Sequence, residues 1–267
     1  MDVLFQCVIR LCASEPLWKN KDLKLSRQEE NLDRLDKLEG NDIDLKVCEI
    51  DEEIVLFEEE ENVEMLVHKT LKEHLGFWKE SGASQFALSL IEHGYRLPLK
   101  SEPGNYEEKN NKSYLKNRIW ANEAVKKLHR GLIVEKVGRK DLECVNPLTV
   151  AENGQGKKRL CIDLSRCVNK VSRAEKFRIE STREARQTIG KGDFCFAFDL
   201  KSAYHQVPIN RGYVKYLGFS IETEEGTEYY QYVMMPFGLN DAARVLTKLL
   251  KSPLERWRRR AFWSLFT

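Results

Sequence analysis

Asp199 is the residue whose position most directly suggests chemistry. It ends the segment from 194 to 199, FCFAFD, in which bulky and small side chains alternate. Because successive side chains of a strand point to opposite faces, the three phenylalanines would share one face and Asp199 the other, beside a cysteine and an alanine. The small face leaves room in front of the carboxylate, which suits a metal ion or a substrate held over a sheet. The alternative is that Asp199 caps the turn that follows the strand.

Two further groups are candidates for contacting a ligand. Tyr204 follows Asp199 by five residues and either contacts such a ligand or packs, half-buried, on the next segment. Lys157, Lys158 and Arg159 stand in the segment GQGKKRL, which lacks the Ser or Thr and the helix of a phosphate-binding P-loop. We therefore place these cations on a hairpin, where they reach toward phosphates or remain a solvated tip.

A helix is expected after residue 240, and one of its faces is basic. Arg244, Lys248 and Lys251 follow one another at helical spacing, with apolar residues beside them. The stripe fits a nucleic-acid backbone or is a solvated face. Just before the helix, the segment MMPFGLND predicts a Pro-Gly turn at which backbone could approach a ligand closely.

The elements that must position these residues are short helices and hairpins. The segment FWKESGASQFALSLIEH has apolar residues at helical spacing at Phe86 and Leu90, and NEAVKKLHR is expected to be a helix that ends at Gly131 and leads into a strand. Two hairpins are expected, one around ENGQG and one turning at residues 225–226. The last helix would be capped by Asn240 or Asp241 and end at Pro253. Helices and hairpins alternate without a strand–helix–strand rhythm, which predicts an α+β fold.

Charge is divided unevenly along the 267 residues. Residues 1–75 carry 20 acidic and 10 basic residues, whereas residues 76–267 carry 22 acidic and 34 basic ones, so the net charge of +2 hides an acidic leader and a basic body. The basic body could hold a polyanion. Within the leader, residues 51–64 hold eight acids and no base, which is typical of a solvated segment or an interaction tail.

The cysteine pattern and the apolar segments argue against zinc-knuckle, disulfide-rich, secreted and membrane-spanning proteins. Seven scattered cysteines without a CxxC pair predict neither a zinc knuckle nor a disulfide framework. The start of the chain lacks the basic segment of a secretory signal, and no stretch reaches the roughly 18 apolar residues of a membrane span. We therefore expect an intracellular protein, of the cytoplasm or nucleus, with no membrane partner.

Taken in order, these motifs resemble the reverse transcriptase domain of retrotransposons. The segment NPLTV…GKKRLCIDLSRCVNK resembles the fingers hairpin, FAFDLKSAYHQVPI resembles the first palm motif, and YYQYVMMPFGLNDAARVLTKLL resembles the strand, turn and helix that follow. The resemblance covers roughly residues 77–257, and QFALSLIEHGYRLPL points to DIRS-like elements. It implies a partial polymerase right hand, with fingers and an incomplete palm.

The chain is expected to have four parts. They are an acidic, largely irregular leader (disordered or partly helical) at 1–75, a helical lead-in at 76–135, the fingers and partial palm at 136–257, and a basic and aromatic tail at 258–267.

The resemblance also implies a role for each candidate residue. Asp199 would be the catalytic carboxylate that binds the first Mg²⁺, and the backbone carbonyl of Leu200 would bind the second. Tyr204 would act as a steric gate against a 2′-hydroxyl. Arg244 and Lys248 would contact the template. The residues expected to bind the nucleotide are Lys157, Lys158, Arg159, Tyr204, Pro236, Phe237 and Gly238.

The expected two-metal site lacks its second half. Nucleotidyl transfer of this type uses two magnesium ions roughly 3.5–4 Å apart, held by several carboxylates. In reverse transcriptases the partners of the first carboxylate are paired aspartates on a hairpin after the final helix, and this sequence contains no Asp-Asp pair. We therefore expect a truncated domain that resembles an RNA-directed DNA polymerase and is inactive alone, with the Asp199 strand short of a neighbour.

Three interpretations stay open at this point. The chain is a polymerase whose site another chain completes, a non-catalytic fragment that binds nucleic acid, or a decayed element without a selected function. The resemblance implies an RNA template or RNA–DNA hybrid and a deoxynucleoside triphosphate as partners.

Overall fold

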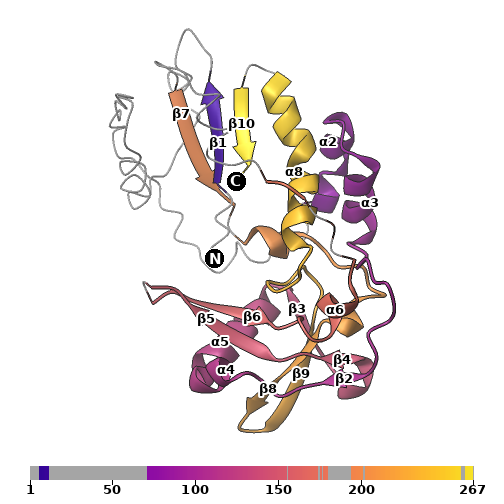
Figure 1. Ribbon diagram of the computed structural model, residues 1–267, viewed down its shortest axis with the longest axis vertical. Coiled ribbons are helices and arrows are strands. Elements are labelled where there is room, and N and C mark those ends of the chain that lie inside the picture. The colour runs from indigo at the N-terminus through magenta and orange to yellow at the C-terminus, as the bar shows by residue number, and fades with distance from the viewer. Residues whose placement is uncertain are drawn as a thin grey trace.

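The computed structural model describes residues 6–11, 71–154, 156–173, 175, 177–179, 194–200, 202–259 and 262–266, and only the backbone of 6–11, 194–199, 257–259 and 262–266. The architecture is mixed α+β, as the order of helices and hairpins predicts. Figure 1 shows a three-stranded sheet beside a long helix at one end and a five-stranded sheet with short helices at the other. Most of the acidic leader, including the acidic run at 51–64, lies outside the described residues.

The five-stranded sheet is mixed in direction. Its order is β2 (Tyr106–Glu107), β4 (Cys144–Val145), β8 (Gly218–Thr223), β9 (Gly226–Tyr232) and β3 (Val134–Val137). The pairs β2–β4 and β4–β8 are parallel, whereas the pairs β8–β9 and β9–β3 are antiparallel. The β8–β9 hairpin confirms the turn predicted near residues 225–226. Alternating aromatic and aliphatic residues of this hairpin are buried and form much of the core.

A separate hairpin joins β5 (Leu148–Glu152) to β6 (Lys158–Ile162). Its register pairs Val150 with Leu160 and Leu148 with Ile162, and all four side chains are buried. The period of two along each strand places Lys158 on this inner face and Arg159 on the opposite face. The hairpin predicted around ENGQG is therefore confirmed, but its neighbouring cations are divided between two faces.

Short helices cover the strands. Among the described residues, the α-helices that precede residue 200 are α2 (Leu75–Glu80), α3 (Gln85–His93), α4 (Lys112–Lys116), α5 (Arg118–Arg130) and α6 (Val168–Val171), and the 3₁₀ turns are η3 (Arg139–Asp141), η4 (Ala203–Gln206) and η5 (Val214–Tyr216). The Ser84 hydroxyl accepts the amide of Ala87 at the start of α3 and so satisfies one of the backbone donors that a helix leaves free. Gly131 ends α5, as predicted.

The last helix, α8 (Ala242–Arg259), is longer than predicted. We expected it to end at Pro253, but Pro253 lies inside the helix and the helix continues beyond it. A proline keeps a helical φ and removes one backbone donor, which costs about 3 kcal/mol in a helix interior. Burial of Ser252 and Leu254 on either side of the proline, against the rest of the fold, favours continuation of the helix.

The three-stranded sheet contains the Asp199 strand, which the sequence predicts to be short of a neighbour. Its order is β10 (Phe262–Phe266), β1 (Gln6–Leu11) and β7 (Phe194–Asp199), with both pairs antiparallel. The Asp199 strand therefore has a neighbour, which the leader supplies, and Gln6 is the register partner of Asp199. Among the described residues, the other edge of β7 pairs with no strand. None of the described helices is long and apolar enough to cross a membrane.

Candidate functional site

The Pro-Phe-Gly turn at 236–238 is pressed against the end of β6. Gly238 has a φ of 118°, and a Cβ atom there would lie 2.0 Å from the carbonyl oxygen of Ile162. The amide of Ile162 also donates to the carbonyl of Phe237 at 3.3 Å. Only glycine combines this backbone conformation with so close an approach. The turn predicted from sequence is confirmed, and its close approach is to β6 of the same chain.

Asn169 of α6 holds the same turn from the other side. Its amide nitrogen donates to the carbonyl of Gly238 at 2.8 Å, and its side-chain oxygen accepts the amide of Asn240 at 3.1 Å. Two side-chain hydrogen bonds to backbone fix the turn relative to the helix that follows β6. Residues 236–240 are therefore a rigid ledge between the β5–β6 hairpin and α8.

Tyr204 packs on this ledge. It lies in η4, is 8% exposed, and meets the ring of Phe237 edge-on with 5.2 Å between ring centroids. Burial raises the pKa of Tyr204 to about 12, so the hydroxyl stays protonated at neutral pH. Of the residues expected to bind a nucleotide, the structure thus brings Tyr204, Phe237 and Gly238 together. Pro236 is buried behind them.

His205 belongs to the same cluster, and sequence reasoning did not identify it. Its ring lies 5.3 Å from that of Phe237 and 6.5 Å from that of Tyr232, measured between centroids. Burial lowers the pKa of His205 to about 4, so the imidazole is neutral at pH 7. Its Nε2 atom is buried and has no hydrogen-bond partner within the described part of the chain.

The remaining predicted residues are more widely spread. Asp199 ends β7, but its side chain lies outside the described residues; Leu200 is partly buried against the core. Lys157 is exposed, and its amide donates to the side-chain oxygen of Asn153 at 2.8 Å. Arg159 lies on the face of the hairpin opposite Lys158. Their roles toward a nucleotide stay predictions.

Arg244 is occupied by partners within the fold. It is 6% exposed, and its guanidinium donates to both carboxylate oxygens of Asp241, at 2.5 and 2.7 Å, and to Glu175 at 2.8 Å. The hydroxyl of Tyr95 donates to the same Asp241 carboxylate, which is 1% exposed. Asp241 therefore precedes α8, as the capping prediction places it, but its carboxylate binds side chains. This buried cluster joins the start of α8 to the segment after α3.

Lys248 is more accessible than Arg244. Its side chain is 47% exposed, its ammonium lies 5.3 Å from the centre of the Phe86 ring, and it is 3.7 Å from Glu175. An ammonium over an aromatic face is attracted by the ring quadrupole and remains able to meet a phosphate. The template contacts predicted for Arg244 and Lys248 stay predictions, and Lys248 is the more accessible of the two side chains.

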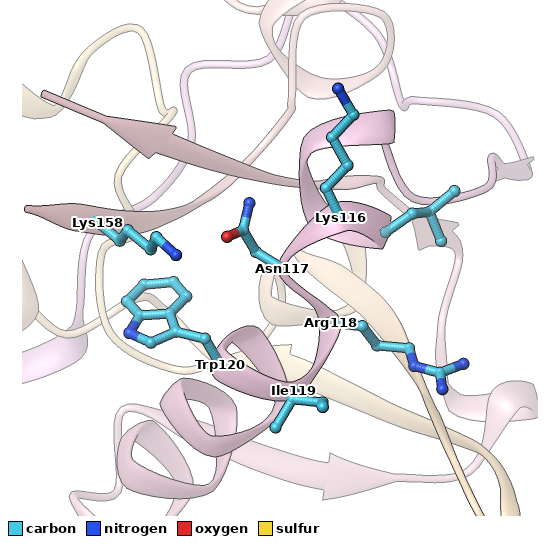
Figure 2. A pocket seen from close by; sticks show the side chains of 7 residues that line it. Lys116, Asn117, Arg118, Ile119, Trp120 and Lys158 are labelled. Carbon is cyan, nitrogen blue, oxygen red and sulfur yellow. The ribbon is translucent and has the colours of Figure 1, made fainter. Parts of the chain in front are cut away.

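A surface pocket of 400 Å³ lies at the junction of α4 and α5, next to the start of β6. Figure 2 shows the Trp120 indole beside Lys158, the Asn117 side chain near both, and the Arg118 and Lys116 side chains extending outward from the helix junction. The lining residues are Leu115, Lys116, Asn117, Arg118, Ile119, Trp120 and Lys158.

The pocket combines charge with exposed apolar surface. Leu115 is 57% exposed, Ile119 83% and Trp120 36%, which is unusual for side chains of this size. Lys116, Arg118 and Lys158 form no ion pair with any carboxylate in the described part of the chain. Among these cations, sequence reasoning identified Lys158 alone. A usable signal exists in RIWANEAV, where Ile and Trp lie off the stripe that buries Ala121 and Val125.

Comparison with known proteins gives a partial match. No protein-family model matches the chain. The Retrovirus-related Pol polyprotein from transposon 297 of Drosophila melanogaster is 27% identical to it over 134 residues. The chain is distantly related to a retrotransposon Pol polyprotein. The match covers 50% of this chain and 12% of that polyprotein.

The donor set for a metal can be judged on the described residues. Within them, no group of three or more His, Cys, Asp or Glu side chains is placed to hold a metal ion. Magnesium prefers six oxygen ligands and is usually fixed by one or two carboxylates together with substrate phosphates and waters. Asp199 alone does not make the two-metal arrangement, and Mg²⁺ binding stays a prediction.

Proposed function

We propose that this chain is a reverse transcriptase-like domain of retrotransposon origin that binds nucleic acid and does not by itself catalyse nucleotidyl transfer. The observation that carries the proposal is the ledge at 236–240. Three segments that resemble reverse transcriptase motifs meet there: the end of β6, the turn with Phe237 and Gly238, and η4 with Tyr204. The partial similarity to a Pol polyprotein supports the same origin.

Tyr204 supports a role in distinguishing sugars. Its ring is fixed by Phe237 on one side, and its hydroxyl is held neutral by burial. A rigid, uncharged ring can exclude a 2′-hydroxyl by contact without drawing cations or protons into the site. In this proposal Phe237 is a positioning residue, because it acts by holding the Tyr204 ring.

The pocket at α4–α5 supports binding of a single strand. Its three cations, which have no ion-pair partner among the described residues, are spread around the pocket and do not converge on one point, which favours a run of phosphates over one small anion. The exposed Trp120 indole offers a surface on which a base can stack, an interaction worth about 1–3 kcal/mol per base. Cations that have no carboxylate partner need not break an ion pair before they bind a phosphate.

In this proposal the chain by itself does not catalyse nucleotidyl transfer. Two magnesium ions would stabilise the attacking and leaving oxygens of the reaction when bound. Asp199 would hold one of them, and the 267 residues contain no Asp-Asp pair to complete the set. The residues of this chain would orient the strand, exclude the 2′-hydroxyl and place phosphates, but they would not assemble the metal pair.

Binding can be tested by titrating the chain with a fluorescent single-stranded RNA at several salt concentrations. We expect log K to fall linearly with log [salt], because each phosphate contact releases counterions. Replacing Lys116, Arg118 and Lys158 together by Gln should reduce the magnitude of that slope by about 2, at roughly 0.7 for each contact. Trp120→Ala should weaken binding by about 1–3 kcal/mol at every salt concentration, since stacking carries no charge.

A matched control is available in Lys140. It is exposed, belongs to η3, and lies outside the pocket. Lys140→Gln changes the net charge by one unit without touching the lining residues, so its slope should equal that of the parent chain. A flat salt response of the parent chain, or an equal effect of Lys140→Gln and Lys158→Gln, would contradict the proposed site.

The catalytic part needs a separate assay. We expect no extension of a DNA primer on an RNA template by the purified chain with either Mg²⁺ or Mn²⁺. Extension that disappears in Asp199→Asn would overturn the proposal that the chain alone is inactive, while leaving the binding proposal intact.

A further inference from the structure

Cys144 and Cys167 form a buried pair of thiols between the five-stranded sheet and α6. Their sulfur atoms are 2.9 Å apart, whereas a disulfide bond is about 2.05 Å long. Cys144 is fully buried and Cys167 is 5% exposed. Both thiols are free. Sulfurs this close need only a small shift to become covalently bonded.

The pair joins two elements that matter for the ledge. Cys144 begins β4, which lies between β2 and β8 in the five-stranded sheet. Cys167 caps the start of α6, the helix whose Asn169 holds the carbonyl of Gly238. A bond between the two sulfurs would therefore tie the sheet directly to the helix that fixes the ledge.

The two thiols are not equivalent. Either sulfur can be the donor while both thiols are neutral; the hydrogen bond lowers the pKa of Cys167, because a thiolate at Cys167 would be stabilised by the Cys144 thiol. The same hydrogen bond, together with burial, raises the pKa of Cys144. Cys161 provides a contrast within the described residues: it lies on β6, and burial raises its pKa without help from a second sulfur. Thiolate character governs which cysteine reacts first.

We propose that Cys144 and Cys167 are an oxidation site that forms an intramolecular disulfide when the folded chain meets hydrogen peroxide. The small exposed fraction of the pair favours an oxidant of this size over a bulky disulfide. This proposal does not depend on nucleic-acid binding.

The chemistry balances in two steps. The Cys167 thiolate attacks one oxygen of peroxide, the O–O bond breaks, and the departing hydroxide takes up the proton that Cys167 released, which gives one water and a sulfenic acid. The sulfur of Cys144 then attacks the Cys167 sulfur, the S–O bond breaks, and the leaving hydroxide combines with the Cys144 proton to give a second water. Two electrons pass from the thiol pair to peroxide.

Trypsin separates the relevant cysteines, so the bond can be read directly. Cleavage after Lys and Arg places Cys144 in the peptide 141–157, Cys161 in 160–166 and Cys167 in 167–170. The full chain is treated with peroxide in the folded state, its remaining thiols are alkylated, and it is digested without reductant. We expect peptides 141–157 and 167–170 to be linked, with a mass two hydrogens below the sum of the two reduced peptides, and the linked species should disappear after reduction. Its mass-spectrometric signal should be at least tenfold above that of any other linked pair that contains Cys144.

Two further measurements keep the result decisive. Oxidation should raise the Tm by about 5–10 °C, because the bond closes a loop of 22 intervening residues in the unfolded chain. The Cys161→Ser variant should give the same linked pair in the same yield. Pairing of Cys144 mainly with another cysteine, or alkylation of both Cys144 and Cys167 after peroxide, would overturn the proposal. A Tm that fails to rise after the bond forms would overturn the claim that the native fold accommodates it.

Discussion

Replacing Gly238 by alanine should destabilise the fold strongly. A φ of 118° is a conformation that side chains with a Cβ rarely adopt, and residues held in such regions cost about 1–3 kcal/mol. The added Cβ would also lie 2.0 Å from the carbonyl oxygen of Ile162. Relief requires the turn to move off β6, which weakens the Ile162–Phe237 and Asn169–Gly238 hydrogen bonds at about 1 kcal/mol each. The expected total is about 3–5 kcal/mol.

Gly226 supplies a matched control for this substitution. Its φ is 127°, close to that of Gly238, but nothing lies within 4 Å of a Cβ built there. Gly226→Ala should therefore show the backbone cost alone, about 1–3 kcal/mol. The difference of about 2 kcal/mol between the two variants measures the close approach of the turn to β6.

Urea unfolding of the parent chain and both variants provides the assay. With a slope of about 2 kcal/mol per M, the Gly238→Ala midpoint should lie about 1 M below that of Gly226→Ala. Equal midpoints would refute the close-approach argument, and with it the claim that residues 236–240 form a rigid ledge. A change of slope instead of midpoint would indicate that the variant altered the compactness of one state.

Two further predictions concern buried polar groups. Because burial holds the pKa of His205 near 4 against about 6.5 in an unfolded chain, protonation favours the unfolded state, and stability should fall as pH drops from about 6.5 toward 4. At pH 5 this loss amounts to about 2 kcal/mol, and the pH profile of His205→Phe should lack it; parallel profiles between pH 7 and 5 would exclude the effect. Asp241→Ala should cost about 3 kcal/mol in urea unfolding because it removes two hydrogen bonds to the buried Arg244 guanidinium and leaves Glu175 as its ion-pair partner, whereas Glu123→Ala, at an exposed ion pair, should leave the urea midpoint nearly unchanged. Similar costs for these two substitutions would contradict the structural role assigned to Arg244.

Local sequence signals predicted the individual elements well. Helical spacing with Gly131 after the last turn identified α5, and the alternating residues on either side of two turn segments identified both hairpins. These features depend on residues near one another in the chain, so a short window contains their physical cause. The predicted end of α8 was wrong. Pro253 disfavours a helix locally, but burial of Leu254 against distant residues favours continuation of the helix.

The candidate site was only partly predictable. The positions of Tyr204, Phe237 and Gly238 followed from motif order, and the structure brings them together. His205 was missed because its neutral, buried state is created by rings from separate segments. Arg244 was expected to reach outward, but an acid three residues earlier and another from a separate segment hold it inside the fold.

The sequence alone determined which chemistry this chain can offer. It contains one carboxylate at the end of an alternating apolar segment, no Asp-Asp pair, and an excess of cations after residue 75. Only the tertiary structure decided which of those groups are available. Strand alternation separated Lys158 from Arg159, ion pairing removed Arg244 from the surface, and packing brought two distant cysteines to 2.9 Å. The physical reason is that composition and motif order set the charges and hydrogen-bonding groups, whereas burial and the partners brought by distant segments set their accessibility and pKa.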